Sequence, residues 1–196
     1  MSEYKRPIPE SYWVEPERFL AGEYPAYAYG EPMRQRLDAF LDLGITTFID
    51  LTDPDELPSY LPMLVEQARY YESEVQHKRF SIPDHNAPAP EVMQNILDEI
   101  DASLAAGHKI FLHCWGGIGR TGTVVGCYLV RHGRTGQEAL RQLAEWWQAV
   151  PKSRIWPITP ETKGQIDFVL NWDESNLTPD PISDPHSGPF PGRERE

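Results

Sequence analysis

The sequence has little cysteine, few positive charges and no long apolar run. Its 196 residues include only two cysteines, Cys114 and Cys127. Two cysteines are too few for a disulfide framework, which favours a reducing compartment. Its 18 basic residues against 30 acidic ones give a formal net charge of −12, which argues against nucleic acid and anionic membranes as partners. No segment approaches the ~18 apolar residues of a membrane span, and the first residues contain no apolar export signal. We therefore expect a cytoplasmic protein.

What is present is typical of one α/β domain. Short apolar runs rich in β-branched residues alternate with amphipathic segments, and this alternation predicts a central, mostly parallel sheet flanked by helices. The predicted strands cover 45–51, 78–82 and 109–113, with one or two short strands within 11–29. The predicted helices cover 31–44, 61–68, 91–106, 121–130 and 135–150, and a last helix is capped by Thr159.

The domain is expected to cover residues 1–172, with its core from about residue 12. The remaining residues, 173–196, hold five prolines and a net charge of −4. Such a composition buries too little apolar surface to fold, so this tail is predicted to be disordered.

One glycine-rich segment, residues 113–121 (HCWGGIGRT), lies between a predicted strand and a predicted helix. A turn rich in glycine can point successive N–H groups into one concavity, and the helix N-terminus adds partial positive charge there. Arg120 offers paired donors for two phosphate oxygens. Cys114 opens this concavity, in an electropositive setting that favours a reactive thiolate. The segment therefore predicts a phosphate cradle with a nucleophile at its floor, and it requires neither metal nor cofactor.

Other interpretations of this segment remain open. Gly117-x-Gly119-x-x-Gly122 fits a dinucleotide fingerprint, yet no strand that would carry the required acidic residue follows the helix. It is not a Walker loop either, because no Gly-Lys-Ser/Thr follows the glycines. A glycine turn with an inert buried cysteine, and a catalytically silent phosphate-binding module, are the remaining alternatives.

Asp84 is the candidate general acid. It follows a predicted strand, in a loop stiffened by proline, and so faces the carboxyl edge of the sheet where Cys114 is expected. A departing alkoxide or phenolate needs a proton from such a group. A turn-forming, solvated aspartate is the alternative. The acidic loop 52–56 at the same edge is interpreted as a solvated turn, because no histidine or cysteine joins it at metal-ligand spacing.

The pattern His113-Cys114-x5-Arg120-Thr121 resembles the signature loop of the cysteine-dependent protein tyrosine and dual-specificity phosphatases. The resemblance implies that Cys114 attacks phosphorus, that Asp84 is the general acid, that Thr121 stabilises the departing thiolate and that His113 holds the loop. It also implies that Arg120 and the loop bind phosphate, the loop residues being Trp115, Gly116, Gly117, Ile118 and Gly119. Tyrosine phosphatases often carry two glutamines that position water. Gln165 matches the second and Glu161 replaces the first, which leaves that role open.

The substrate is expected to be protein phosphotyrosine, with phosphoserine or phosphothreonine and non-protein phosphate esters as alternatives. The five residues between Cys114 and Arg120 are uncharged, so Arg120 is the only cation of the loop. Polyphosphorylated inositols would favour more positive charge. Trp115 and the aromatic segment 24–29 offer apolar walls for a phenyl ring.

Overall fold

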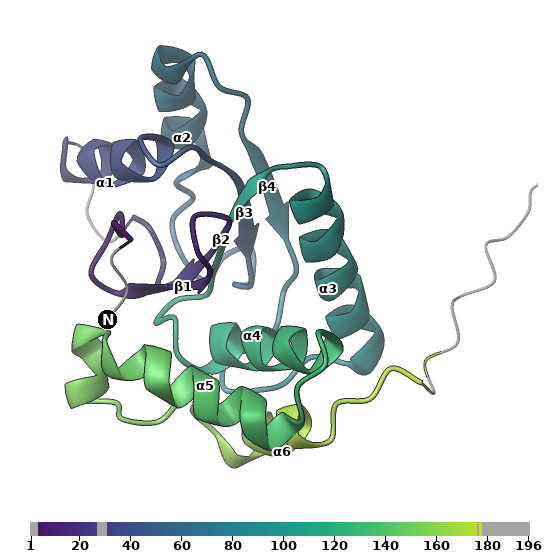
Figure 1. The fold of residues 1–196 in the computed structure, drawn as a ribbon. Helices are drawn as coiled ribbons and strands as arrows, with labels where there is room; N and C mark the ends of the chain where they lie inside the picture. The colour runs from purple at the N-terminus through teal and green to yellow at the C-terminus, as the bar shows by residue number, and fades with distance from the viewer. Residues whose placement is uncertain (1–3, 27–30, 176, 178–196) are drawn as a thin grey trace, which may run out of the picture.

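The computed structural model describes residues 4–26, 31–175 and 177 (Figure 1). Its sheet has five strands in the order β1-β2-β5-β3-β4. Only β1 runs antiparallel to its neighbour, and the other pairs are parallel. The strands are β1 (Ser11–Glu15), β2 (Phe19–Gly22), β3 (Ile45–Asp50), β4 (Gln76–Arg79) and β5 (Lys109–His113). The predicted α/β fold with a mostly parallel sheet is confirmed.

Helices cover both faces of this sheet (Figure 1). They are α1 (Glu31–Leu41), α2 (Leu61–Ala68), α3 (Pro90–Ala105), α4 (Gly119–Arg131), α5 (Gly136–Gln148) and α6 (Lys163–Leu170), with short 3₁₀ helices η1 (Arg69–Tyr71) and η2 (Pro151–Arg154). Alternate strand residues serve the two layers, as the period of two in a strand requires. Phe111 of β5 packs with α1 and α2, whereas Ile110 and Leu112 pack with α3 to α6. Both faces of β5 are therefore buried.

The position of β5 determines where the site forms. It lies between β2 and β3, and its last residue, His113, is in register with Gly22 of β2 and Asp50 of β3. Because all three strands are parallel, their carboxyl ends meet at one edge of the sheet. The glycine-rich loop begins at this edge, directly after β5, and α4 follows it.

Two boundaries differ from the sequence predictions. The last helix does not begin after Thr159: its N-cap is Thr162, which forms a capping box with Gln165. Strand β4 covers 76–79 rather than 78–82. The chain nevertheless stays beside β3, because Phe80 N donates to Asp50 O and Ile82 N donates to Leu51 O. The predicted capping box of α5, between Thr135 and Glu138, is present.

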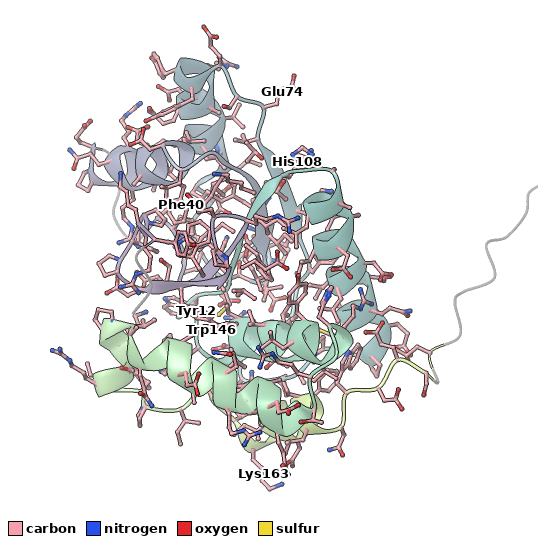
Figure 2. All side chains as sticks on the ribbon, viewed as in Figure 1. Tyr12, Phe40, Glu74, His108, Trp146 and Lys163 are labelled. Atoms are coloured by element: carbon pink, nitrogen blue, oxygen red, sulfur yellow. The ribbon has the colours of Figure 1, made fainter. Side chains whose placement is uncertain are left out.

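Antiparallel β1 closes one edge of the sheet against α5. Tyr12 and Trp146 lie side by side in Figure 2, with their rings stacked at a centroid distance of 6.0 Å.

The segment after α6 is fixed by an ion pair between Arg131 of α4 and Glu174. Most of the predicted disordered tail, 173–196, lies outside the described residues. None of the helices in the described ranges has the length and apolar character of a bilayer-spanning segment.

Candidate active site

The loop between β5 and α4 is held from outside by its carbonyl groups. Four of these carbonyls accept a hydrogen bond from a group outside the loop: Cys114 O from His113 Nδ1 (3.2 Å), Trp115 O from Tyr24 N (2.9 Å), Gly116 O from Lys152 Nζ (3.3 Å) and Ile118 O from Thr159 Oγ1 (2.8 Å). A peptide group whose C=O points outward directs its N–H inward. The loop therefore turns N–H donors toward Cys114, and Gly117 N donates to Cys114 Sγ at 3.3 Å.

Gly117 shows why this loop needs glycine. Its φ is +74°, a left-handed conformation that side chains rarely adopt. A Cβ placed there would also lie 2.6 Å from the carbonyl carbon of Gly22 and 2.7 Å from Glu23 N. The loop therefore packs directly on the end of β2, with no space for a side chain between them.

His113 is buried and holds the first peptide of the loop. Its Nδ1 must carry the proton in order to donate to Cys114 O, and its Nε2 then accepts from Tyr60 OH at 2.7 Å. Burial lowers the pKa of His113 to about 4, although Asp50 opposes the shift. The imidazole is therefore neutral near pH 7. This arrangement agrees with the expected loop-holding role of His113.

Arg120 is almost fully buried, and only some of its guanidinium nitrogens have hydrogen-bond partners among the described residues. Nη1 and Nη2 donate to the two carboxylate oxygens of Glu56 at 2.7 and 2.6 Å, and Nη1 also donates to Ile82 O at 3.2 Å. Nε is buried and has no hydrogen-bond partner among the described residues. The edge formed by Nε and Nη2 has the geometry to donate to two oxygens of an anion, and Asp84 Oδ1 lies 3.1 Å from Nη2.

Glu56 is the residue that the sequence analysis misjudged. It belongs to the acidic loop after β3 that was interpreted as solvated, yet its side chain is only 15% exposed and pairs with Arg120. The hydrogen bonds from Arg120 lower the pKa of Glu56. The one sequence signal was its position at the carboxyl end of a strand beside β5. That position alone does not identify a partner 64 residues away.

Asp84 stands over the cradle, as its position after β4 predicts. Its carboxylate is half exposed and lies 3.1 Å from Nη2 of Arg120 and 3.4 Å from His85 Nε2. Asn86 Nδ2 donates to the carbonyl of Asp84 at 2.9 Å, which stabilises the turn. Asp84 therefore contacts Arg120 at Nη2 from a half-exposed position.

The remaining predicted residues also lie at the cradle. Thr121 is fully buried, and its hydroxyl has no hydrogen-bond partner in the described part of the chain. The amide of Gln165 is buried and engaged: Oε1 accepts from Thr162 N and Nε2 donates to Asn86 O, each at 3.1 Å. Glu161 lines the pocket, and its Oε2 lies 3.4 Å from His85 Nδ1. Cys127 is a buried core residue, and burial raises its pKa.

A pocket of about 330 Å³ opens over Cys114 and Arg120. Its wall includes Trp115 and Trp156, which are 46% and 45% exposed, and Lys152. The sequence did not predict that Lys152 and Trp156 line this pocket, because they belong to η2 and the loop after it, far along the chain from residues 113–121. Arg120 is the only cation of the loop itself, but it is not the only cation of the pocket.

Lys152 is itself anchored by a buried acid. Its ammonium lies 2.5 Å from Glu23 Oε2, and Glu23 Oε1 accepts from Arg36 Nη2 at 2.9 Å. Burial raises the pKa of Glu23, whereas Lys152 and Arg36 both lower it. Glu23 follows β2 directly, so this network joins the end of that strand to the phosphate loop through Lys152.

The geometry combines a buried cysteine, inward N–H donors, a prealigned guanidinium and an overhanging acid. No group of three or more histidine, cysteine, aspartate or glutamate side chains within 4–26, 31–175 and 177 is arranged to hold a metal ion. The sequence profile of a protein family described as "Tc-R-P: Polymorphic toxin system, DSP-PTPase phosphatase" matches residues 25–134. The chain belongs to this DSP-PTPase family.

Curated relatives of this chain support the assignment to the family. The chain is 30% identical over 135 residues to the mouse dual specificity protein phosphatase CDC14B, a match that covers 62% of this chain and 24% of the relative. It is 29% identical over 120 residues to mouse dual specificity protein phosphatase 1, covering 61% of this chain and 29% of the relative. The chain thus spans about a quarter of the length of these relatives.

Solved structures agree with the fold of the DSP-PTPase. The active form of Tk-PTP is 27% identical, with a TM-score of 0.59, and the match covers 83% of this chain and 94% of that one. Kinase-associated phosphatase matches with a TM-score of 0.61 over 77% of this chain and 83% of that one. Its identity of 17% shows the shared fold alone.

Replacing Glu56 by glutamine tests the alignment of Arg120. A neutral amide cannot keep two charge-assisted hydrogen bonds, each worth ~1.5–3 kcal/mol, so orthovanadate affinity and kcat/KM should fall by about 10- to 100-fold.

The same variant should change the pH dependence of stability. Because the pKa of Glu56 is lowered, the stability that its pair with Arg120 adds is present above the ordinary glutamate pKa of ~4.3. It disappears only as pH falls through the lowered value. The free energies of unfolding of the two proteins in urea should therefore differ by a constant amount from pH 5 to 8, and the difference should disappear as the pH falls through the lowered pKa of Glu56. The control is Asp55→Asn, on the same loop. Equal loss in this control would contradict the assignment.

Replacing Lys152 by methionine tests the hydrogen bond that holds the Gly116 carbonyl outward. The variant keeps a long apolar stem but loses the donor to Gly116 O and one of the cations beside buried Glu23. A lost hydrogen bond of ~1 kcal/mol should weaken orthovanadate binding about fivefold, measured by inhibition of turnover. Arg154→Met, on the same short helix, should change it less than twofold. Unchanged vanadate affinity in Lys152→Met would show that the tie is dispensable.

Proposed function

We propose that this phosphatase hydrolyses phosphotyrosine in proteins through a cysteinyl-phosphate intermediate. The observation that carries the proposal is the pairing of chemistries in one pocket: Trp115 and Trp156, both nearly half exposed, line the same cavity as Cys114 and Arg120. Exposed indole faces offer apolar area for a phenyl ring, and the N–H donors with Arg120 suit its phosphate. Acidic Asp84 and Glu161 at the rim disfavour polyanionic headgroups.

In the first step, the Cys114 thiolate attacks phosphorus and the ester P–O bond breaks. The N–H groups of the loop and the Nε–Nη2 edge of Arg120 stabilise charge on the equatorial oxygens. Asp84 transfers its proton to the departing oxygen, so the product leaves as a neutral alcohol or phenol. Its position beside Nη2 of Arg120 at the solvent side of the cradle supports this role.

In the second step, water attacks the phosphocysteine and the S–P bond breaks. Asp84, now a carboxylate, accepts the proton of the water, and the thiolate departs. Thr121 is suited to stabilise that thiolate, because its buried hydroxyl has no competing partner among the described residues. Glu161 is better placed than Gln165 to contact the water, because it lines the pocket while the Gln165 amide is occupied in the α6 cap. The two free cysteines are consistent with work in a reducing cytoplasm.

Cys114→Ser should abolish turnover while orthovanadate binding survives. A hydroxyl is a far weaker nucleophile at neutral pH, whereas the N–H donors and Arg120 remain. Release of phosphate from p-nitrophenyl phosphate measures turnover, and protection against thermal unfolding measures binding. Cys127→Ser, in the core, should keep most of the activity. Residual turnover above a few per cent in Cys114→Ser would exclude Cys114 as the nucleophile.

Asp84→Asn should lower kcat on phenyl phosphate by roughly 10²–10⁴-fold, because no acid then protonates the phenolate. The loss should be much smaller with p-nitrophenyl phosphate, whose leaving group departs more readily as an anion. Steady-state kinetics on both substrates provide the test, with Asp55→Asn as the control. An equal loss on both substrates would mean that Asp84 is not the acid.

The substrate class is tested by kcat/KM on a phosphotyrosine peptide, a phosphoserine peptide and a soluble phosphoinositide in one buffer. We expect phosphotyrosine to exceed phosphoinositide by more than tenfold, because the indole walls favour an aromatic ring. A phosphoinositide rate within tenfold would favour non-protein phosphate esters and contradict the proposal. Comparable phosphoserine turnover would indicate dual specificity with the same chemistry. Absence of turnover on all three, with phosphate still bound, would support a silent binding module.

A further inference from the structure

Exposed large hydrophobic side chains are unevenly distributed over the molecule. Those away from the pocket in the described chain are Tyr4 before β1, Val65 on α2, Tyr70 on η1 and Leu170 at the end of α6. Next to the catalytic pocket, in contrast, residues 155–158 (Ile-Trp-Pro-Ile) are exposed in succession, with Ile155 72%, Trp156 45% and Ile158 60% accessible. We call residues 155–158 the apolar strip. Contiguous exposed apolar surface of this kind marks a contact surface.

The apolar strip is held firmly although its side chains face solvent. Trp156 N donates to Lys152 O at 2.9 Å, and Trp156 O accepts from Trp147 Nε1 at 2.7 Å. At the other end, buried Thr159 donates to Ile118 O of the phosphate loop at 2.8 Å. The strip is therefore fixed relative to Cys114, and its apolar side chains are exposed without being part of a mobile tip.

The position of the strip identifies what it contacts. Trp156 lines the cavity that contains Cys114 and Arg120, and Ile155 and Ile158 are one and two residues away along the chain. A polypeptide whose phosphate is held at Cys114 leaves the pocket past its lining, which Trp156 shares with the acidic side chains of Asp84 and Glu161. Successive residues of an extended peptide are ~3.3–3.6 Å apart, so a residue next to the phosphotyrosine reaches the strip.

The chemistry of the strip selects the neighbour of the phosphotyrosine. None of the four residues carries a charge or a side-chain hydrogen-bonding group other than the indole N–H of Trp156. A polar or charged flanking residue would lose water there without gaining a partner, whereas an apolar one gains by burial. We propose that the apolar strip is the docking surface for a large aliphatic or aromatic residue adjacent to the phosphotyrosine of the substrate polypeptide. This inference rests on the proposed function and specifies its substrate further.

The test compares two phosphotyrosine peptides that differ only in the residues flanking the phosphotyrosine, leucine in one and serine in the other. The wild-type protein should favour the leucine peptide by about tenfold in kcat/KM, the effect of ~1.4 kcal/mol of differential binding. Ile155→Ser/Ile158→Ser should reduce this preference to less than about threefold, mainly by lowering the rate on the leucine peptide. Turnover of p-nitrophenyl phosphate, which has no flanking residues, should stay within twofold. Val65→Ser/Tyr70→Ser, two exposed hydrophobics on α2 and η1, is the matched control and should leave the preference intact.

Four outcomes would overturn the inference. Equal wild-type rates on both peptides would show that the strip selects nothing, while phosphotyrosine turnover would leave the proposed function standing. A preference that survives in Ile155→Ser/Ile158→Ser would place recognition elsewhere. A concentration-dependent dimer that this double variant alone disrupts, without an effect on peptide preference, would assign the strip to contact between two copies of the chain. Failure of wild-type protein to cleave either peptide, with p-nitrophenyl phosphate still hydrolysed, would instead overturn the proposed function together with this inference.

Discussion

The candidate active site depends on the direction of a few peptide groups. In a trans peptide group the C=O and the N–H point in opposite directions. When a carbonyl of the loop is held outward, the N–H of the same peptide group therefore points into the turn. Here the outward ties come from four separate parts of the chain, namely the end of β5, the segment after β2, helix η2 and the loop before α6. The cradle for phosphate is therefore a property of the whole sheet edge, although its sequence signature covers only residues 113–121.

Charge is organised locally against the charge of the whole molecule. The chain carries a net charge of −12, and two acids, Glu56 and Asp84, contact Arg120 directly. They contact the guanidinium in different ways. Glu56 accepts from both Nη1 and Nη2 and fixes the orientation of the guanidinium. Asp84 contacts Nη2 alone and is half exposed. Low local dielectric strengthens the attraction between this buried cation and an anion that reaches Nε, which has no hydrogen-bond partner among the described residues.

The parts of the fold that sequence patterns predicted are those with local causes. Strand, glycine turn and helix succeed one another within residues 109–131, so the local order and spacing of residues predicted the phosphate cradle with Cys114 and Arg120. The start of α6 was predicted wrongly because two threonines, Thr159 and Thr162, both precede the helix and either could cap it. Thr162 has Gln165 three residues later and completes a capping box, while the Thr159 hydroxyl is used by Ile118 O. Glu56, Lys152 and Trp156 were missed because their roles arise from contacts between distant segments, which a single sequence does not display.

The central claim is that phosphate passes through Cys114. A single-turnover experiment measures this most directly: the protein is mixed with an aryl phosphate in substoichiometric amount, quenched within milliseconds and digested for peptide mass spectrometry. We expect a transient phosphate on the peptide that contains Cys114. It should form as the phenol is released and disappear as inorganic phosphate is produced. Release of phenol and phosphate together with no covalent intermediate, or a phosphate on another residue, would contradict it.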